Sequence, residues 1–414
     1  MEINKTEPMK LKITSFMMTR FIVTACCVVL LVSTTRGEAV FWRVLSSNTV
    51  SITSVNRSSI TWANAVPNQL EQVQRATSLA PDNWQDYMRV SSTNTHARAR
   101  VADPNTPVGM VYIPAGGFEM GDAFNEGTGF FTNDVPVHTV QVSAFYMDTF
   151  EVNNEEMRSV LQWAYDEGKI GATSTSVTNN EGSPISLFQL DEFDAEISFS
   201  NGVFSVAAGR EDFPCIHVEW FGAQAYCNYK SDMEDLDRCI DFSDWSCDFT
   251  KNGYRLPTEA EWEKAARGGL NGKRYPWGNT IDGSQANFTV SGDPFGAGEF
   301  AFTTQTTPVG YYNGQQTPAG IDMANGYGLY DMAGNVSEWC FDWYAEDWYS
   351  QPGATQIDTT GPANGILLAF RVARGGSWAY SSNGDTLRCA DRNAFSPRGN
   401  GLSEAVGFRA VRRP

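Results

Sequence analysis

Asp331 and Glu338 flank a glycine-containing turn, and their spacing could hold a metal ion. The two side chains supply carboxylates, while the main-chain carbonyls of Gly334 and Val336 can point into the same turn. Hard oxygen ligands on a tight turn are the set that Ca²⁺ prefers. The sequence therefore predicts a calcium site here. The alternative is an Asp-capped turn whose Glu points outward, next to a buried Trp339.

Sulfur and imidazole ligands are present but scattered. Six of the eight cysteines follow the N-terminal segment, and only Cys239 and Cys247 lie close enough in sequence to suggest a disulfide across a hairpin. Free buried thiols are the alternative, and sequence alone does not choose among pairings. The chain has three histidines and contains no CxxC pair, HExxH, GxSxG or phosphate-binding loop. These absences argue against a zinc protease, a serine hydrolase of that type and a P-loop nucleotide hydrolase.

The composition limits the possible partners. The chain has 414 residues, with 30 Lys plus Arg against 48 Asp plus Glu and a net charge of −18. Such a balance argues against binding nucleic acid, which needs a basic face to meet phosphates. With 42% hydrophobic residues the chain can build packed cores, and its length is typical of about two or three domains.

The N-terminus has the pattern of a targeting segment. Basic residues precede an apolar run at 21–32, and small residues follow at Gly37 and Ala39. A run of this length suits the core of a signal peptide and falls short of the ~20 residues that span a bilayer. We therefore expect residues 1–39 to be a signal peptide cleaved near Ala39, leaving an exported protein without a membrane span. An uncleaved membrane anchor is the alternative.

The elements that would position these residues fall in two regions. Residues 40–105 contain short alternating runs, as at 51–55 and 59–62, which predict a small β-sandwich-like module. Residues 102–107, rich in Pro, Asp and Asn, are typical of a linker.

Beyond the linker, hydrophobic spacing predicts short elements. Thr258 and Glu261 form a capping box, so a helix should begin there and run to about Arg267 before two glycines. The other expected elements are a half-buried strand over 140–146, a helix over 154–166, a helix from Trp220 to Tyr229, and a polar, β-rich stretch over 171–213.

Several phrases of the chain occur in a set order. They read GMVYIPAGGFEMG (109–121), RLPTEAEWE (255–263) followed by AARGG (265–269), YPWGN (275–279), NGYGLYDMAGNVSEW (325–339), RGGSW (374–378), RCADR (388–392) and GFR (407–409). Together they closely resemble the formylglycine-generating enzyme, or sulfatase-modifying factor, family over about residues 108–413. The resemblance implies an α+β, C-type-lectin-like fold with little regular structure.

The resemblance also bears on calcium. The family positions that hold a structural calcium correspond to Asp331, Gly334, Val336 and Glu338 in this chain. Those that hold a second calcium correspond to Asn287 and Phe288. The acidic ligand that completes the second site is not matched, because its position reads Ala301, two residues from Glu299.

The catalytic positions depart from the family pattern. Active members oxidise a substrate cysteine with O₂ and hold Cu(I) with two cysteines, because soft thiolates select the cuprous ion. Here the first position reads Tyr380 and the second falls near Asp385. Copper is therefore not expected. Both disulfides implied by the resemblance are half missing, since the positions opposite Cys227 and Cys389 read Ala410 and Ala266.

Three functions follow from these observations. The first is an exported, calcium-stabilised, non-copper member that binds a peptide, a glycan or a small molecule. The candidate residues of its cleft, chosen by position, are Ser377, Trp378, Tyr380, Arg388 and Arg392. Trp378 could instead be a core residue, and the two arginines could instead be partners of buried acids. The second is a formylglycine-generating oxidase, or another oxidase with an unrecognised cofactor. The third is a structural surface module in which residues 40–105 dock to a partner.

Overall fold

The chain forms two compact units, residues 1–105 and 106–414. The division falls within the linker expected at 102–107. The computed structural model describes the backbone of the strands between residues 33 and 100, followed by residues 106–125, 134–182, 184–289, 291–295, 306–363, 370–379, 384–398 and 405–414.

The described part of the first unit consists of antiparallel strands in two sheets. One sheet has the order β1-β2-β5-β6, formed by Ser33–Thr35, Glu38–Leu45, Leu70–Ala76 and Gln85–Ser91. The other has the order β3-β4-β7, formed by Ser51–Asn56, Ser59–Ala63 and His96–Arg100. β1 and the start of β2 lie inside the expected signal peptide, so cleavage near Ala39 would remove β1. Sandwich packing of the two sheets stays a prediction.

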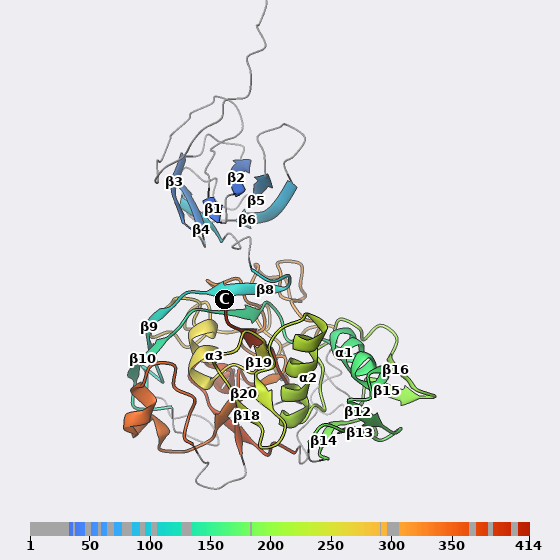
Figure 1. The fold of residues 1–414 in the computed structure, drawn as a ribbon. Coiled ribbons are helices and arrows are strands. Elements are labelled where there is room, and N and C mark those ends of the chain that lie inside the picture. Colours follow the sequence, from blue (N-terminus) through green and yellow to red (C-terminus); the bar gives the residue numbers. More distant parts are fainter. Residues whose placement is uncertain are drawn as a thin grey trace, which may run out of the picture. The chain divides into compact units, whose positions relative to one another are not determined.

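The second unit contains three α-helices among its described residues: α1 (Asn154–Asp166), α2 (Trp220–Met233) and α3 (Glu259–Ala266) (Figure 1). α1 has the expected bounds, and it buries Met157, Val160, Leu161 and Ala164, as its apolar spacing predicts. α2 begins at Trp220, as expected, and continues four residues past Tyr229. Both capping-box hydrogen bonds of α3 are present at Thr258.

Many short strands surround these helices. A four-stranded sheet has the order β19-β24-β11-β8, formed by Tyr254–Arg255, Val411–Arg412, Phe145–Asp148 and Met110–Ile113. A second has the order β22-β21-β20-β23, formed by Asn393–Phe395, Arg371–Arg374, Ser337–Trp343 and Val406–Gly407. There are four smaller sheets among the described residues of this unit. One pairs β9 (Gly116–Met120) with β10 (His138–Val142), and a three-stranded sheet has the order β12 (Ile170–Ala172), β13 (Ser176–Asn179), β14 (Ser186–Gln189). The other two pair β15 (Ile197–Ser200) with β16 (Val203–Val206), and β17 (Ile240–Asp241) with β18 (Ser246–Cys247).

The prediction of a single strand over 140–146 is wrong. Strand β10 ends at Val142, strand β11 begins at Phe145, and the two strands join different sheets. Val140 and Val142 are buried, as the alternation predicts, but Phe145, Tyr146 and Met147 are all buried in succession. A strand covered on both faces does not alternate, so period-two reasoning cannot continue through it.

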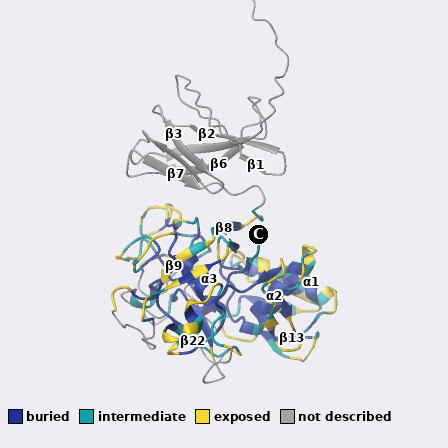
Figure 2. Ribbon diagram, turned by 60° about the vertical axis from the view of Figure 1, so that its left-hand side comes forward, coloured by how far each residue is buried: buried dark blue, intermediate teal, exposed yellow. Residues whose placement is uncertain are grey.

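The core of the second unit contains two large hydrophobic clusters, one with residues of α1, α2 and the smaller sheets and one with residues of α3, β9 and β10. Its buried residues gather around α2, α3 and the strands, and exposed residues lie mainly on the loops (Figure 2). Short 3₁₀ turns also occur at Trp348–Ser350, Pro352–Thr355 and Asp385–Leu387. No helix in the described part of the chain is both long and apolar enough to cross a membrane. Few helices and many short strands confirm an α+β unit.

Candidate functional site

β20 brings distant phrases of the sequence together. Glu338 on this strand lies opposite Arg374 of β21, in antiparallel register, and opposite Gly407 of β23, in parallel register. α3 contacts both β20 and β21. The phrases around residues 255–269, 325–339, 374–378 and 407–409 therefore meet at one place in the fold.

Glu338 is fully buried and accepts three hydrogen bonds there. Its Oε2 accepts from Trp262 Nε1 at 2.7 Å and from Arg409 Nε at 2.7 Å. Its Oε1 accepts from Arg409 Nη2 at 2.7 Å. Charge-assisted, bidentate pairing of this kind is strong and directional. Glu338, a ligand of the first predicted calcium site, thus also holds Arg409 in the core.

The turn between Asp331 and β20 is unusually tight. Asp331 and Asn335 have positive φ angles of 57° and 61°, which Asp and Asn tolerate better than most residues. Gly334 is required, because a Cβ there would lie 2.1 Å from the carbonyl oxygen of Asn287. Asp331 is half-buried, and its Oδ2 accepts a hydrogen bond from Gly310 N at 2.6 Å.

Asn335 ties this turn to three other segments. Its Nδ2 donates to Glu151 Oε2 at 2.7 Å, and its Oδ1 accepts from Thr307 N at 2.9 Å. Its backbone oxygen accepts from Trp378 N at 3.0 Å. The other oxygen of Glu151 accepts from Val336 N at 3.2 Å. Asn335 lies inside a recognised phrase, which could have drawn attention to it, whereas no sequence signal singled out Glu151.

Acidic side chains crowd the turn. Burial raises the pKa of Asp331 to about 6, and the charge of Glu338 adds to the effect. Burial, with the charges of Asp331 and Glu338, raises the pKa of Glu151 well above its usual range. Three acidic groups therefore crowd around one close arginine, Arg409.

The side chains alone do not form a metal cage. Among the described residues, no three His, Cys, Asp or Glu side chains are grouped to hold a metal ion. A calcium ion at this turn would need Asp331 together with main-chain carbonyls, with Glu338 shared between the ion and Arg409. The carbonyls expected for this role, those of Gly334 and Val336, lie in the same tight turn.

The residues of the second predicted calcium site adjoin the first. Asn287 and Phe288 are buried, and the carbonyl of Asn287 accepts a hydrogen bond from Asn335 N at 2.9 Å. Asn287 Nδ2 lies 3.3 Å from Asn335 Oδ1. The positions of its missing acidic ligand, Glu299 and Ala301, lie outside the described residues. Both calcium sites stay predictions.

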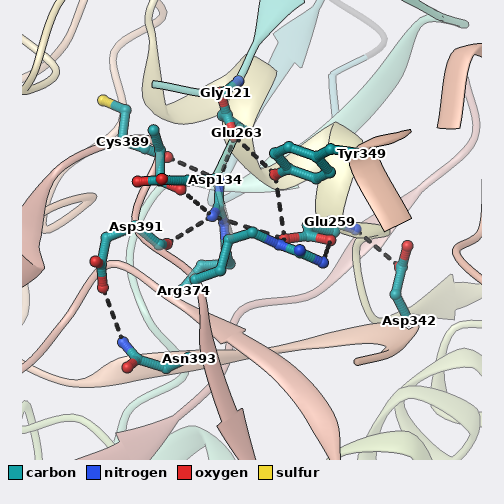
Figure 3. A network of polar contacts seen from close by, with 12 residues as sticks. Gly121, Asp134, Glu259, Glu263, Asp342, Tyr349, Arg374, Cys389, Asp391 and Asn393 are labelled. Atoms are coloured by element: carbon teal, nitrogen blue, oxygen red, sulfur yellow. Dashed lines mark hydrogen bonds and ion pairs between the residues drawn. The ribbon is translucent and has the colours of Figure 1, made fainter. Parts of the chain in front are cut away.

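α3 supplies the acidic half of a buried ion-pair network (Figure 3). Glu263 Oε1 accepts from Arg267 Nη2 at 2.6 Å and from Gly121 N at 2.8 Å, while its Oε2 accepts from Arg374 Nη2. Although burial alone would raise the pKa of Glu263, Arg267 and Arg374 hold it below its usual range. The carboxylate is therefore ionised and shared between two elements.

Arg388 and Arg392, two of the expected cleft residues, lie in the same interior. Arg392 pairs with Glu259 through Nε at 2.6 Å and Nη2 at 2.9 Å. Arg388 lies 3.1 Å from a carboxylate oxygen of Asp122 and 3.1 Å from one of Asp134. Both arginines are at most 2% exposed. The structure thus places them in the other role that the sequence left open, as partners of buried acids.

The remaining cleft residues, Ser377, Trp378 and Tyr380, follow β21 in the sequence. Ser377 is fully buried, and Trp378 is half-buried. Tyr380 lies outside the described residues. Asp385, at the second copper position, is half-buried and begins a 3₁₀ turn. Two surface hollows, along residues 163–238 and 181–248, are lined by none of these residues.

The cysteines of the second unit are all thiols. Cys215, Cys227, Cys340 and Cys389 are fully buried, and Cys239 is nearly so, while Cys247 is half-buried. Cys227 and Cys389, each half of an implied family disulfide, have no bonded partner among the described residues. Burial raises the pKa of Cys389 to about 12. This thiol therefore stays protonated four residues from Asp385.

The geometry defines a class of protein. It is an α+β unit with few helices, many short strands and buried arginine–carboxylate pairs that join them. A family model for the sulfatase-modifying factor enzyme 1-like domain matches residues 96–414. The formylglycine-generating enzyme of Thermomonospora curvata is 32% identical over 332 residues, covering 74% of this chain and 94% of that protein. The chain therefore belongs to the sulfatase-modifying factor family, as the ordered phrases predicted.

Two further relatives differ in what they cover. Treponema denticola variable protein 1, a solved structure, matches with a TM-score of 0.50 and 28% identity over 74% of this chain and 95% of that one. The serine/threonine-protein kinase pkn1 of Chlamydia caviae is 34% identical over 303 residues, covering 73% of this chain but 38% of that protein. The chain thus spans only part of that curated relative. The fold of the formylglycine-generating enzymes is confirmed for the second unit.

Proposed function

We propose that this chain is an exported, calcium-stabilised member of the family that binds a peptide, a glycan or a small molecule and does not perform copper-dependent cysteine oxidation. The observation that carries the proposal is the pair of residues at the copper positions. Tyr380 and Asp385 offer a phenol and a carboxylate, which are hard oxygen ligands and do not select Cu(I).

The surroundings of Asp385 support the same conclusion. Cys389 is the nearest cysteine in sequence, and it is fully buried as a neutral thiol. A copper site needs thiolates, since the deprotonated sulfur is the ligand. Moving Cys389 to the surface would break the bond that its backbone N–H donates to Arg274 O at 2.7 Å.

The burial of the arginines narrows the binding surface. Arg388 and Arg392 are held by acids in the interior, so among the described cleft residues Trp378 is the one whose side chain is accessible enough to meet a ligand. A half-buried aromatic side chain can stack on a sugar ring or cover an apolar side chain of a peptide. Export rests on the N-terminal pattern of basic residues, apolar run and small residues.

An oxidase assay tests the proposal. The full chain is loaded with Cu(I) and incubated under O₂ with a peptide containing a sulfatase-type cysteine, with the Thermomonospora curvata relative as positive control. We expect the peptide thiol to be retained and no aldehyde to form, as judged by mass spectrometry and hydrazide capture. Aldehyde formation at a rate near that of the control would overturn the proposal and favour the oxidase function.

A further inference from the structure

Cys239 and Cys247 lie at the two ends of a small hairpin. Ile240 of β17 pairs with Cys247 of β18, and Asp248 N donates to the carbonyl of Cys239 at 2.8 Å. Cys239 directly precedes β17 and Cys247 ends β18, so the pairing of the two strands brings the two cysteines close together. The thiol of Cys239 also lies 3.3 Å from Gly253 O. These are two neighbouring sulfurs held by backbone pairing.

Of the six cysteines in the second unit, Cys239 and Cys247 are the least deeply buried. Cys239 lines a surface hollow of about 480 Å³, and Cys247 is half-buried. By contrast, Cys215, Cys227, Cys340 and Cys389 are completely buried. A small reagent that enters the hollow can therefore approach Cys239, and Cys247 is partly open to solvent, while the other four thiols stay protected.

The local charge favours a thiolate in the pair. The interaction with Cys247 lowers the pKa of Cys239, and the guanidinium of Arg255 lowers it further, against the effect of burial. The same interaction raises the pKa of Cys247 well above its usual range. Arg255 is itself held by Glu261, with two bonds of 2.7 Å. A lowered pKa next to a fixed cation is the setting of reactive cysteines.

We propose that Cys239 and Cys247 form a redox-active dithiol that closes reversibly to a disulfide, with a small-molecule disulfide such as oxidised glutathione as the oxidant. The thiolate of Cys239 attacks one glutathione sulfur, which forms a mixed disulfide and releases one glutathione thiolate. Cys247 then loses its proton and attacks the sulfur of Cys239, so that the second glutathione leaves as a thiolate. Two protein thiols are oxidised, one glutathione disulfide is reduced, and the two protons pass to the released thiolates.

The sequence offers a direct assay. Trypsin cuts after Arg238 and Lys251, and the peptide between them contains both cysteines. The native full chain is incubated with oxidised glutathione, alkylated under denaturing conditions and digested. We expect this peptide to lose two hydrogens and to resist alkylation, and we expect reduced glutathione to reverse the change. Cys215, Cys227, Cys340 and Cys389 should remain fully alkylated.

Single variants distinguish closure from simple adduct formation. Cys239→Ser and Cys247→Ser each leave one sulfur, so each should retain one glutathione as a stable mixed disulfide. If a variant fails to fold, the mass of the wild-type peptide still shows whether the disulfide between Cys239 and Cys247 has formed. Two alkylatable thiols in that peptide after oxidation, a glutathione adduct without closure, or equal oxidation of the buried cysteines would each overturn the proposal.

Discussion

Glu263 carries one negative charge between two arginines in a part of the core that water does not reach. It binds Arg267, which directly follows α3, and Arg374 on β21, so it joins α3 to the sheet that contains β20 and β21. Removing one partner of a buried pair leaves an uncompensated charge, and this costs more free energy than the intact pair contributes. The Glu263 carboxylate is therefore expected to stabilise the fold, independently of where a ligand binds.

Glu263→Gln tests this role. The amide cannot accept from both arginines, so we expect the free energy of unfolding to fall by about 3–5 kcal/mol. The measurement is urea unfolding followed by tryptophan fluorescence. Glu155→Gln is the matched control, because Glu155 pairs with Arg158 at 2.5 Å on the surface of α1, and such a pair contributes about 0–1 kcal/mol. Equal losses in the two variants would contradict the assignment.

Calcium binding is tested at Asp331. If the turn holds Ca²⁺, EDTA should lower the melting temperature, since a ligand that binds only the folded chain stabilises it. Asp331→Asn should remove most of this sensitivity. Asp331 is a cleaner choice than Glu338, whose loss would also free Arg409. The measurement is calorimetry with and without chelator, and a melting temperature that EDTA leaves unchanged in the wild type would refute the calcium site.

Helix α3 begins with a capping box. Glu261 N donates to Thr258 Oγ1 at 3.2 Å, and Thr258 N donates to Glu261 Oε2 at 2.9 Å. Glu261 also holds Arg255, so the cap connects the helix to β19. A local sequence signal thus positions the acids that the core arginines bind.

Thr258→Ala should destabilise the unit by about 1 kcal/mol or more, because the N–H of Glu261 loses its partner in a buried place. Asn153→Ala provides the comparison, since Asn153 forms the same capping box at the more exposed start of α1. We expect the smaller loss there. Denaturant midpoints of the two variants measure the difference, and a neutral Thr258→Ala would show that packing alone holds α3.

At the scale of the whole molecule, buried carboxyl groups make stability depend on pH. Burial raises the pKa of Asp391 to about 8, from 3.8, and that of Asp148 to about 6. Burial also raises the pKa of Asp342 well above its usual range. The folded chain then holds protons that the unfolded chain releases. The stability that these groups contribute is full below a pH of about 4 and is lost as the pH rises through the folded-state pKa values.

We therefore expect the melting temperature, measured in EDTA, to fall as the pH rises from 6 to 8, the upper part of the window set by Asp391. The effect of this one group is at most about 1.4 kcal/mol per pH unit. Asp391→Asn removes the titrating group and should flatten the profile. Glu263, whose pKa is lowered, acts in the opposite direction and only at acid pH. A melting temperature that rises over the same interval would contradict the expectation.

How much of the fold sequence could predict depends on the range of the interaction. The bounds of α1 and the start of α3 were predictable, because helix spacing and capping involve residues within one or two turns. The split at Ser143 was not, since the strands on either side join different sheets. The site divides in the same way, because Asp331 and Glu338 stand out by spacing, whereas Glu151 reaches Asn335 from 184 residues away.

The order of the phrases, and the phenol and carboxylate at the copper positions, could be read from the chain itself, because covalent order and residue type need no folding. Which acid holds which arginine was decided only by the tertiary structure. Arg392 meets Glu259 across 133 positions and Arg409 meets Glu338 across 71, and such pairs exist only once the sheets bring their ends together. Burial then sets the charge state of each group, because the protein interior makes an unpaired charge costly.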